Sequence, residues 1–158
     1  EVAGVIAPRM KRHGIRFVQE FAPGLGRFEL DAGQIQAALV NILENAVDAC
    51  LEDRQKAEHR VVFRIRREAQ QAVFEVEDNG IGMDAETRAG IFTLFASSKA
   101  DKGTGLGLFV AAKIVRQHGG EITVASEPGQ GACFSVRLPA VGGESGAPAE
   151  KTTRDPEA

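Results

Sequence analysis

The chain has 158 residues, of which 43% are hydrophobic, and this size and composition suit one domain with an apolar core. Its 19 basic and 22 acidic residues give a net charge of −3 without any basic run, which argues against a nucleic-acid-binding surface. No apolar run approaches the roughly 18 residues of a membrane span, no signal-peptide pattern is found, and the two cysteines form neither a zinc spacing nor a disulfide framework.

The N-terminal part predicts a short helix followed by a strand. Residues 1–13 are typical of the end of a helix, which Pro8 and Gly14 limit. Residues 15–21 read as a strand, a Pro- and Gly-containing loop follows, and residues 28–30 predict a second, short strand.

A helix over residues 32–54 is the clearest secondary-structure prediction, with Asp31 as its N-cap. Apolar residues recur along it at the 3.6-residue period, and a polar stripe lies opposite them. Most such stripes are solvated surface, but Asn is a poor interior helix former and here recurs one turn apart. We therefore treat the stripe as a candidate binding surface. It consists of Asn41, Glu44, Asn45 and Asp48.

The middle of the chain predicts a β-hairpin and then a short helix. Two strands, 61–67 and 72–77, are joined by a polar turn. Asp84 can cap a short helix, and residues 91–95 form a compact apolar segment. Residues 96–102 carry small and charged side chains without a period, which predicts a mobile loop.

A carboxylate stands at the end of the second hairpin strand. Phe74 and Val76 alternate with glutamates there, so Asp78 inherits the inward-facing side of the strand. Gly80 and Gly82 follow it and allow backbone to approach a ligand closely. A buried carboxylate needs a hydrogen-bond partner, which a ligand amine could supply. The alternative is an ordinary β-turn with a solvated aspartate.

Three glycines, at positions 103, 105 and 107, precede an apolar helix that Gly119 and Gly120 end. Free backbone N–H groups and the positive end of the helix together would make a phosphate cradle, although a flexible hinge is the alternative. No strand directly precedes these glycines and no Gly-Lys-Ser/Thr follows, which excludes a Rossmann turn and a P-loop. Two further strands, at 121–126 and 132–138, complete the predicted elements.

Four segments resemble, in family order, the sequence boxes of the catalytic ATP-binding domain of two-component sensor histidine kinases. The similarity runs from about residue 31 to residue 139, and the family belongs to the Bergerat-fold group with DNA gyrase B, heat-shock chaperones and mismatch-repair ATPases. Ser97, Ser98 and Lys99, close before the last box, resemble the nitrogen-regulation type of kinase. The boxes are N (residues 41–46, NILENA), G1 (78–82, DNGIG), F (91–95, IFTLF) and G2 (103–108, GTGLGL).

This resemblance implies an α/β fold, a two-layer α/β sandwich in which a mixed sheet of about five strands packs on three helices and carries an ATP lid. We expect the catalytic core at residues 31–140 and a disordered tail at 141–158, where Gly and Pro are frequent. Residues 1–30 would then be an N-terminal strand region with the remnant of a linker from a dimerisation domain. Because the first residue is Glu1 rather than Met, we expect the chain to be part of a longer protein.

The resemblance also implies ATP and Mg²⁺ as ligands and gives roles to individual residues. Asp78 would receive the adenine amino group. Asn45 would coordinate the Mg²⁺ that bridges the phosphates, with support from Asn41. Glu44, together with Asn41, would assist phosphoryl transfer. The other implied nucleotide contacts are Asp48, Gly80, Gly82, Met83, Lys99 in the lid, and Gly103, Thr104, Gly105, Leu106, Gly107 and Leu108 in the lid hinge and phosphate cradle.

The chain departs from the family pattern at two positions. Many family members have Lys where this chain has Asp48, which cannot neutralise a phosphate, so its role stays open between water and metal positioning. Ala132 stands where a hydroxyl is frequent. His13, His59 and His118 all lack the setting of a phosphorylated histidine, so the acceptor histidine would belong to a separate domain.

The predicted function is transfer of the γ-phosphate of ATP to that histidine, for relay to an aspartate of a response regulator. An ATP-hydrolysing or ATP-gated switch of the gyrase and chaperone type is the alternative, and a non-catalytic nucleotide-binding module is a third. Those ATPases activate water with a Glu at the first N-box position, whereas the Asn41 amide cannot act as a general base. The resemblance further implies a cytoplasmic domain without membrane contact of its own, whether or not the full-length protein is membrane-anchored.

Overall fold

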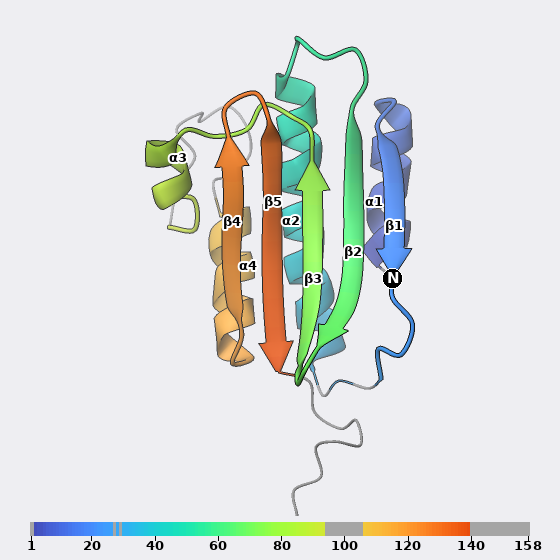
Figure 1. The fold of residues 1–158 in the computed structure, drawn as a ribbon, viewed down its shortest axis with the longest axis vertical. Helices are drawn as coiled ribbons and strands as arrows, with labels where there is room; N and C mark the ends of the chain where they lie inside the picture. Colours follow the sequence, from blue (N-terminus) through green and yellow to red (C-terminus); the bar gives the residue numbers. More distant parts are fainter. Residues whose placement is uncertain (1, 27, 29, 94–105, 140–158) are drawn as a thin grey trace, which may run out of the picture.

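The computed structural model describes residues 2–26, 28, 30–93 and 106–139. Five strands form one sheet in the order β1-β2-β3-β5-β4, and helices α1, α2 and α4 lie side by side on one of its faces (Figure 1). The predicted two-layer sandwich with a mixed five-stranded sheet is therefore confirmed. The elements are α1 (Val2–Arg12), β1 (Arg16–Phe21), α2 (Ala32–Glu52), β2 (Arg60–Glu68), β3 (Gln71–Asp78), α3 (Ala85–Ala89), α4 (Gly107–Gln117), β4 (Glu121–Glu127) and β5 (Gly131–Pro139).

The sheet is mixed because β1 pairs with β2 in parallel, whereas all other neighbours are antiparallel. The predicted β2–β3 hairpin is present, with Val61 opposite Asp78. On its other side β3 pairs with β5, where Asp78 lies opposite Ala132. Asp78 therefore ends a strand that has a neighbour on each side, close to the middle of the sheet.

The core lies between the sheet and the three helices. Alternate residues of β3, among them Phe74 and Val76, face α2, whose apolar stripe packs onto them. Phe92 of the predicted F box joins this core, since its ring stands edge-on to the Phe134 ring at 5.9 Å between centroids. The fully buried side chains of α2 are Ile42, Leu43, Ala46 and Val47, each 0% exposed.

Capping side chains set the helix starts as the sequence predicts. The Asp31 carboxylate accepts the Gln34 N–H at 3.1 Å, and the Asp84 carboxylate accepts the Thr87 N–H at 2.8 Å. Helix α2 ends at Glu52, two residues before the predicted end, because Asp53 takes an extended conformation with φ −82° and ψ 122°. The chain then turns away into the loop that leads to β2.

The N-terminal residues belong to the same core, and one helix there runs further than the sequence indicates. Helix α1 continues through Pro8 to Arg12, although an interior proline costs about 3 kcal/mol. Ile6 and Met10 are both 0% exposed, and burial of such side chains contributes about 1.5–3 kcal/mol each, enough to offset that cost.

Three other expectations concern the loops. Phe28 and Leu30 lie outside any strand, so the short strand predicted there is wrong; instead the Arg67 guanidinium lies 5.8 Å from the centroid of the Phe28 ring. The loop at 96–102 and the tail at 141–158 lie outside the described residues. Within the described ranges, no helix has both the length and the apolar character that a bilayer crossing requires.

Candidate functional site

Asp78 is the most unusual side chain of the described structure. It is 3% exposed and lies on the same inward face as Phe74 and Val76, as the alternation predicts. Its Oδ1 accepts the Gly80 N–H at 2.8 Å, while its Oδ2 is buried and has no hydrogen-bond partner among the described residues. Burial raises the pKa of Asp78 to about 6, against the N–H groups of Gly80 and Ala132, which lower it. A buried acceptor without a partner is costly, and a ligand donor would relieve that cost.

The turn after Asp78 packs between helix α2 and the turn that joins β4 to β5. The Ile81 N–H donates to the Ala49 carbonyl of α2 at 3.1 Å, and the Ile81 carbonyl accepts the Gly129 N–H at 2.7 Å. A Cβ on Gly80 would lie 2.5 Å from the Ala49 carbonyl oxygen. Gly82 has a φ of +73°, and a Cβ there would lie 2.0 Å from the Glu127 carbonyl oxygen. Packing against the protein therefore already requires both glycines, and their contact with a base stays a prediction.

The N box and the start of α4 lie next to each other. A Cβ built on Gly107 would be 3.7 Å from the Asn41 side chain, so Asn41 of the polar stripe lies beside the N-terminus of α4. Asn41 and Asn45 are half-buried, and no hydrogen bond to their side-chain amides is found in the described part of the chain. Helix α4 begins without a side-chain cap at Leu106. The Asn41 amide and a helix N-terminus thus border the same region, as an anion site would require.

The acidic half of the polar stripe points to the other neighbouring helix. Arg9 of α1 forms an ion pair with Glu44, and its Nη2 donates to Asp48 Oδ1 at 3.0 Å. Position 48 therefore carries a carboxylate that an arginine neutralises. Arg9 belongs to no motif and lies 35 residues before Glu44, so the sequence gives no signal for this contact.

A buried hydroxyl and a lysine support the turn, and sequence reasoning missed both. Ser126 is 8% exposed; its Oγ accepts the Met83 N–H at 2.9 Å and donates to the Gly131 carbonyl at 2.8 Å. The Lys56 ammonium lies 3.3 Å from the Gly80 carbonyl oxygen. Of the other predicted contacts, Leu108 is buried in the core, while the structural setting of four others lies outside the described residues: Lys99, Gly103, Thr104 and Gly105.

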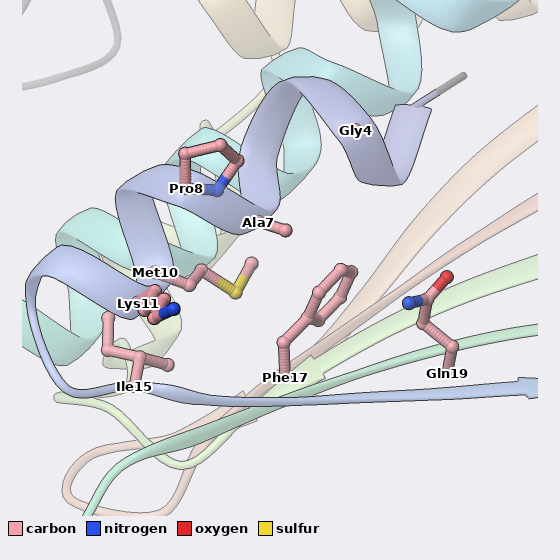
Figure 2. A pocket seen from close by; sticks show the side chains of 8 residues that line it. All are labelled: Gly4, Ala7, Pro8, Met10, Lys11, Ile15, Phe17 and Gln19. Carbon is pink, nitrogen blue, oxygen red and sulfur yellow. The ribbon is translucent and has the colours of Figure 1, made fainter.

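A groove of about 720 Å³ lies elsewhere, between α1 and β1 (Figure 2). Met10, Ile15 and Phe17 point into the space between the helix and the strand, and Lys11 and Gln19 stand beside it. None of its lining residues is a predicted site residue, so this groove is separate from the region around Asp78.

The family described as "Histidine kinase-, DNA gyrase B-, and HSP90-like ATPase" matches residues 30–142. Three relatives are the methanogenesis regulatory histidine kinase FilI of Methanothrix harundinacea (strain 6Ac), the sensor histidine kinase ZraS of Klebsiella oxytoca and the signal transduction histidine-protein kinase AtoS of Escherichia coli (strain K12). They are 37%, 41% and 38% identical over 82%, 76% and 79% of this chain. The matched parts make up 14%, 25% and 20% of their lengths, so the chain corresponds to one part of much longer proteins.

Solved structures agree with this assignment. The catalytic domain of histidine kinase ThkA has a TM-score of 0.75 at 25% identity, with 88% of each chain covered. Full-length ShkA in complex with AMPPNP has a TM-score of 0.76 at 28% identity, covering 88% of this chain and 28% of that one. With four boxes in order, the same sandwich and these similarities, the chain belongs to the histidine kinase-, DNA gyrase B- and HSP90-like ATPase family, as a catalytic ATP-binding domain of the sensor histidine kinase kind.

Proposed function

We propose that this domain binds ATP with Mg²⁺ and transfers the γ-phosphate to a histidine on a separate dimerisation and phospho-acceptor domain. A response regulator aspartate would then receive the phosphate. The observation that carries the proposal is the buried, unpartnered Oδ2 of Asp78, which fits the exocyclic amine of adenine. The named sensor kinases among the relatives, and the AMPPNP complex of ShkA, support the same ligand class.

Adenine would enter beside the G1 turn. Its amino group would donate to Asp78 Oδ2 while the Gly80 N–H keeps Oδ1 in place. Guanine presents a carbonyl oxygen at the same ring position, and two acceptors facing each other repel. A site that hydrogen-bonds a substrate amine discriminates strongly against an analogue without it, because its own buried group is then left unpaired. Backbone around Gly80, Gly82 and Met83 would flank the base.

The phosphates would lie between α2 and the start of α4. Asn41 and Asn45 offer amide oxygens, which are hard ligands suited to Mg²⁺. Across the described residues no three His, Cys, Asp or Glu side chains gather into a metal site, so phosphate oxygens and these amides would form the coordination sphere. When bound, Mg²⁺ supplies charge neutralisation at the transferring phosphate. We assign the remaining phosphate contacts to Lys99 and to residues 103–108.

Glu44 would assist the transfer step from its place on α2. Its ion pair with Arg9 fixes a carboxylate that lies one helical turn after Asn41 and directly before Asn45 in α2. Asp48, in the same arginine pair, would hold Arg9 rather than a phosphate. The acceptor imidazole nitrogen would form its bond to phosphorus as the bond from the γ-phosphorus to the bridging oxygen breaks, which leaves ADP.

Water activation is not favoured in this site. The gyrase-type alternative needs a carboxylate at position 41, and Asn41 cannot take a proton from water. We therefore expect slow hydrolysis without an acceptor. Because the proposed phosphate donor is ATP and the proposed acceptors are signalling domains, we place the domain in the cytoplasm and without membrane or nucleic-acid contact of its own.

Labelled ATP separates the two functions. The domain is mixed with [γ-³²P]ATP and Mg²⁺, with and without the dimerisation domain of the same full-length protein. We expect acid-labile, alkali-stable phosphohistidine on the acceptor and little free phosphate without it. Phosphate release that is fast and independent of the acceptor would establish the ATPase alternative instead. The Asp78→Asn variant serves as the control that should do neither.

A further inference from the structure

The loop between α2 and β2 is built against the turn that carries Asp78. Its central residue is Lys56, whose Nζ lies 3.3 Å from the Gly80 carbonyl oxygen and 3.5 Å from Asp53 Oδ1. The Asp53 side chain is 5% exposed, and its Oδ2 accepts the Lys56 N–H at 3.0 Å and contacts His59 Nε2 at 2.8 Å. Lys56 is therefore held at both its backbone and its ammonium group.

A second residue fastens the same loop to the same turn. Asn79 Oδ1 accepts the Arg60 N–H at 2.8 Å, and Asn79 Nδ2 donates to the Glu58 carbonyl at 3.1 Å. The Asn79 side chain thus points back into the loop, away from the region that Asp78 Oδ2 faces. The loop and the turn form one hydrogen-bonded unit.

Lys56 acts on the peptide group next to the one that binds Asp78. The Gly80–Ile81 peptide is held at both ends, because Lys56 contacts its carbonyl and Ala49 accepts its N–H at 3.1 Å. The preceding N–H, that of Gly80, is the donor to Asp78 Oδ1. Lys56 and Ala49 thus hold the backbone at Gly80, whose N–H orients the Asp78 carboxylate.

Charge acts in the same direction as geometry. The charged and titratable groups near Asp78 are Glu77, which precedes it in β3, the Cys50 thiol of α2, and Lys56, which pairs with Asp53. Burial and, to a smaller extent, the nearby Asp78 charge raise the pKa of Cys50 to about 12, so this thiol is neutral. Lys56 is the cation in this set, and its charge adds to the larger effect of the Gly80 and Ala132 N–H groups, which favour the ionised form of Asp78 against burial.

We propose that Lys56 is a positioning residue for base recognition, which holds the Gly80 peptide and keeps Asp78 charged and oriented for an adenine amine. This inference rests on the proposed role of Asp78 as the adenine acceptor. It places the determinant in the α2–β2 loop, which lies outside all four sequence boxes.

The test measures the ADP dissociation constant by calorimetry between pH 5.5 and pH 8.5. Ionised Asp78 accepts from the amine more strongly than the protonated acid does, so wild-type affinity should fall as the pH drops through about 6. Lys56→Gln keeps a donor near the Gly80 carbonyl but removes the charge. We expect its half-loss of affinity to move to higher pH, because the nearby Lys56 charge lowers the pKa of Asp78. Lys56→Met should show the same shift and weaker binding at every pH, and Lys56→Arg should restore the wild-type curve.

Two controls separate this effect from others. Lys113→Gln removes an exposed lysine of α4 and should leave the curve unchanged. His59→Gln removes the imidazole that contacts Asp53 and should leave the midpoint unchanged. The proposal would be overturned if Lys56→Gln and Lys56→Met lost the same affinity at every pH and the midpoint of the affinity curve did not move. Lys56 would then have a structural role only.

Failure of the proposal and failure of the proposed function give different results. If Asp78→Asn binds ADP as the wild type does, the adenine site itself is wrong. If Asp78→Asn loses binding but Lys56→Gln and Lys56→Met follow the wild-type curve, only the role of Lys56 is wrong. Should Lys56→Met not fold, Lys56→Gln and Lys56→Arg still decide the question, since both retain a polar group at the Gly80 carbonyl.

Discussion

Arg9 of α1 donates to the carboxylate of Asp48 of α2 at 3.0 Å, and through its other terminal nitrogen it pairs with Glu44. A helix before the first strand is thereby tied to the N box. The pair explains why a carboxylate is tolerated at position 48 next to the proposed phosphate site, because the arginine neutralises it.

This pair predicts a measurable coupling. Arg9→Met and Asp48→Ala should each lower the free energy of unfolding, and together by less than the sum of the two. We expect a coupling of about 0.5–1 kcal/mol, because the carboxylates are 40% and 47% exposed and solvent screens them. Urea unfolding of the two single variants and the double variant provides the measurement. Additive losses would mean that the contact contributes nothing to stability.

Asp78→Asn is predicted to abolish nearly all ATP and ADP binding. The variant replaces a charged acceptor by an amide, and hydrogen bonds to charged groups are worth about 1.5–3 kcal/mol, or roughly ten- to a hundred-fold in affinity. Calorimetric titration at pH 7.5 measures the effect, with Glu75→Gln on the opposite face of β3 as the matched control. A dissociation constant equal to that of the wild type would contradict the assignment.

The same variant should make the nucleotide-free domain more stable. Burial raises the pKa of Asp78 from 3.8 to about 6, so the folded state binds more protons than the unfolded state between these values. Wild-type stability should therefore rise as the pH falls from 7 to 4, by up to about 3 kcal/mol from this group alone. Asp78→Asn should lack that part of the pH dependence and exceed the wild type at pH 7.5. Urea midpoints at pH 4, 6 and 7.5 test it, and parallel wild-type and variant profiles would speak against a buried charge.

The sequence reveals those features of the site that depend on residues close together in the chain, and it misses contacts between residues far apart in it. The burial of Asp78 follows from alternation over Phe74 and Val76, and the helix at 32–52 follows from its period, since both patterns are local. The Arg9–Glu44 pair joins residues 35 apart, and the Lys56–Gly80 contact joins residues 24 apart. No periodicity predicts such contacts, because they depend on how α1 and the α2–β2 loop pack. Pro8 shows the same limit, since tertiary burial overrides a local helix breaker.

Asn45→Ala should weaken nucleotide binding far more in Mg²⁺ than in a chelator. The side-chain amide makes no hydrogen bond within the described part of the protein, so its loss leaves no protein group unpaired. An amide oxygen that coordinates Mg²⁺ contributes only when the metal is present. ADP titrations in excess Mg²⁺ and in EDTA give the comparison. Gln34→Ala, at the exposed start of α2, is the control. Equal losses with and without metal would show that Asn45 is not a metal ligand.

Ser126→Ala should loosen the turn that carries Asp78 without touching the nucleotide. The Ser126 hydroxyl is buried and connects the Met83 N–H to the Gly131 carbonyl, so alanine leaves two polar backbone groups without this partner. An unsatisfied buried polar group costs about 1–3 kcal/mol. For a domain near this size, each kcal/mol lost lowers Tm by roughly 2–4 °C.

Thr123→Ala, at an exposed position of the same strand, should change stability by no more than about 0.5 kcal/mol. Because Met83 adjoins Gly82, hydrogen exchange of residues 80–83 should quicken in Ser126→Ala relative to both the wild type and the Thr123 control. If exchange in this segment is unchanged while the global stability falls, the hydroxyl stabilises β4 and β5 alone. If neither changes, water replaces the hydroxyl at both backbone groups, and the bridge has no part in holding the turn.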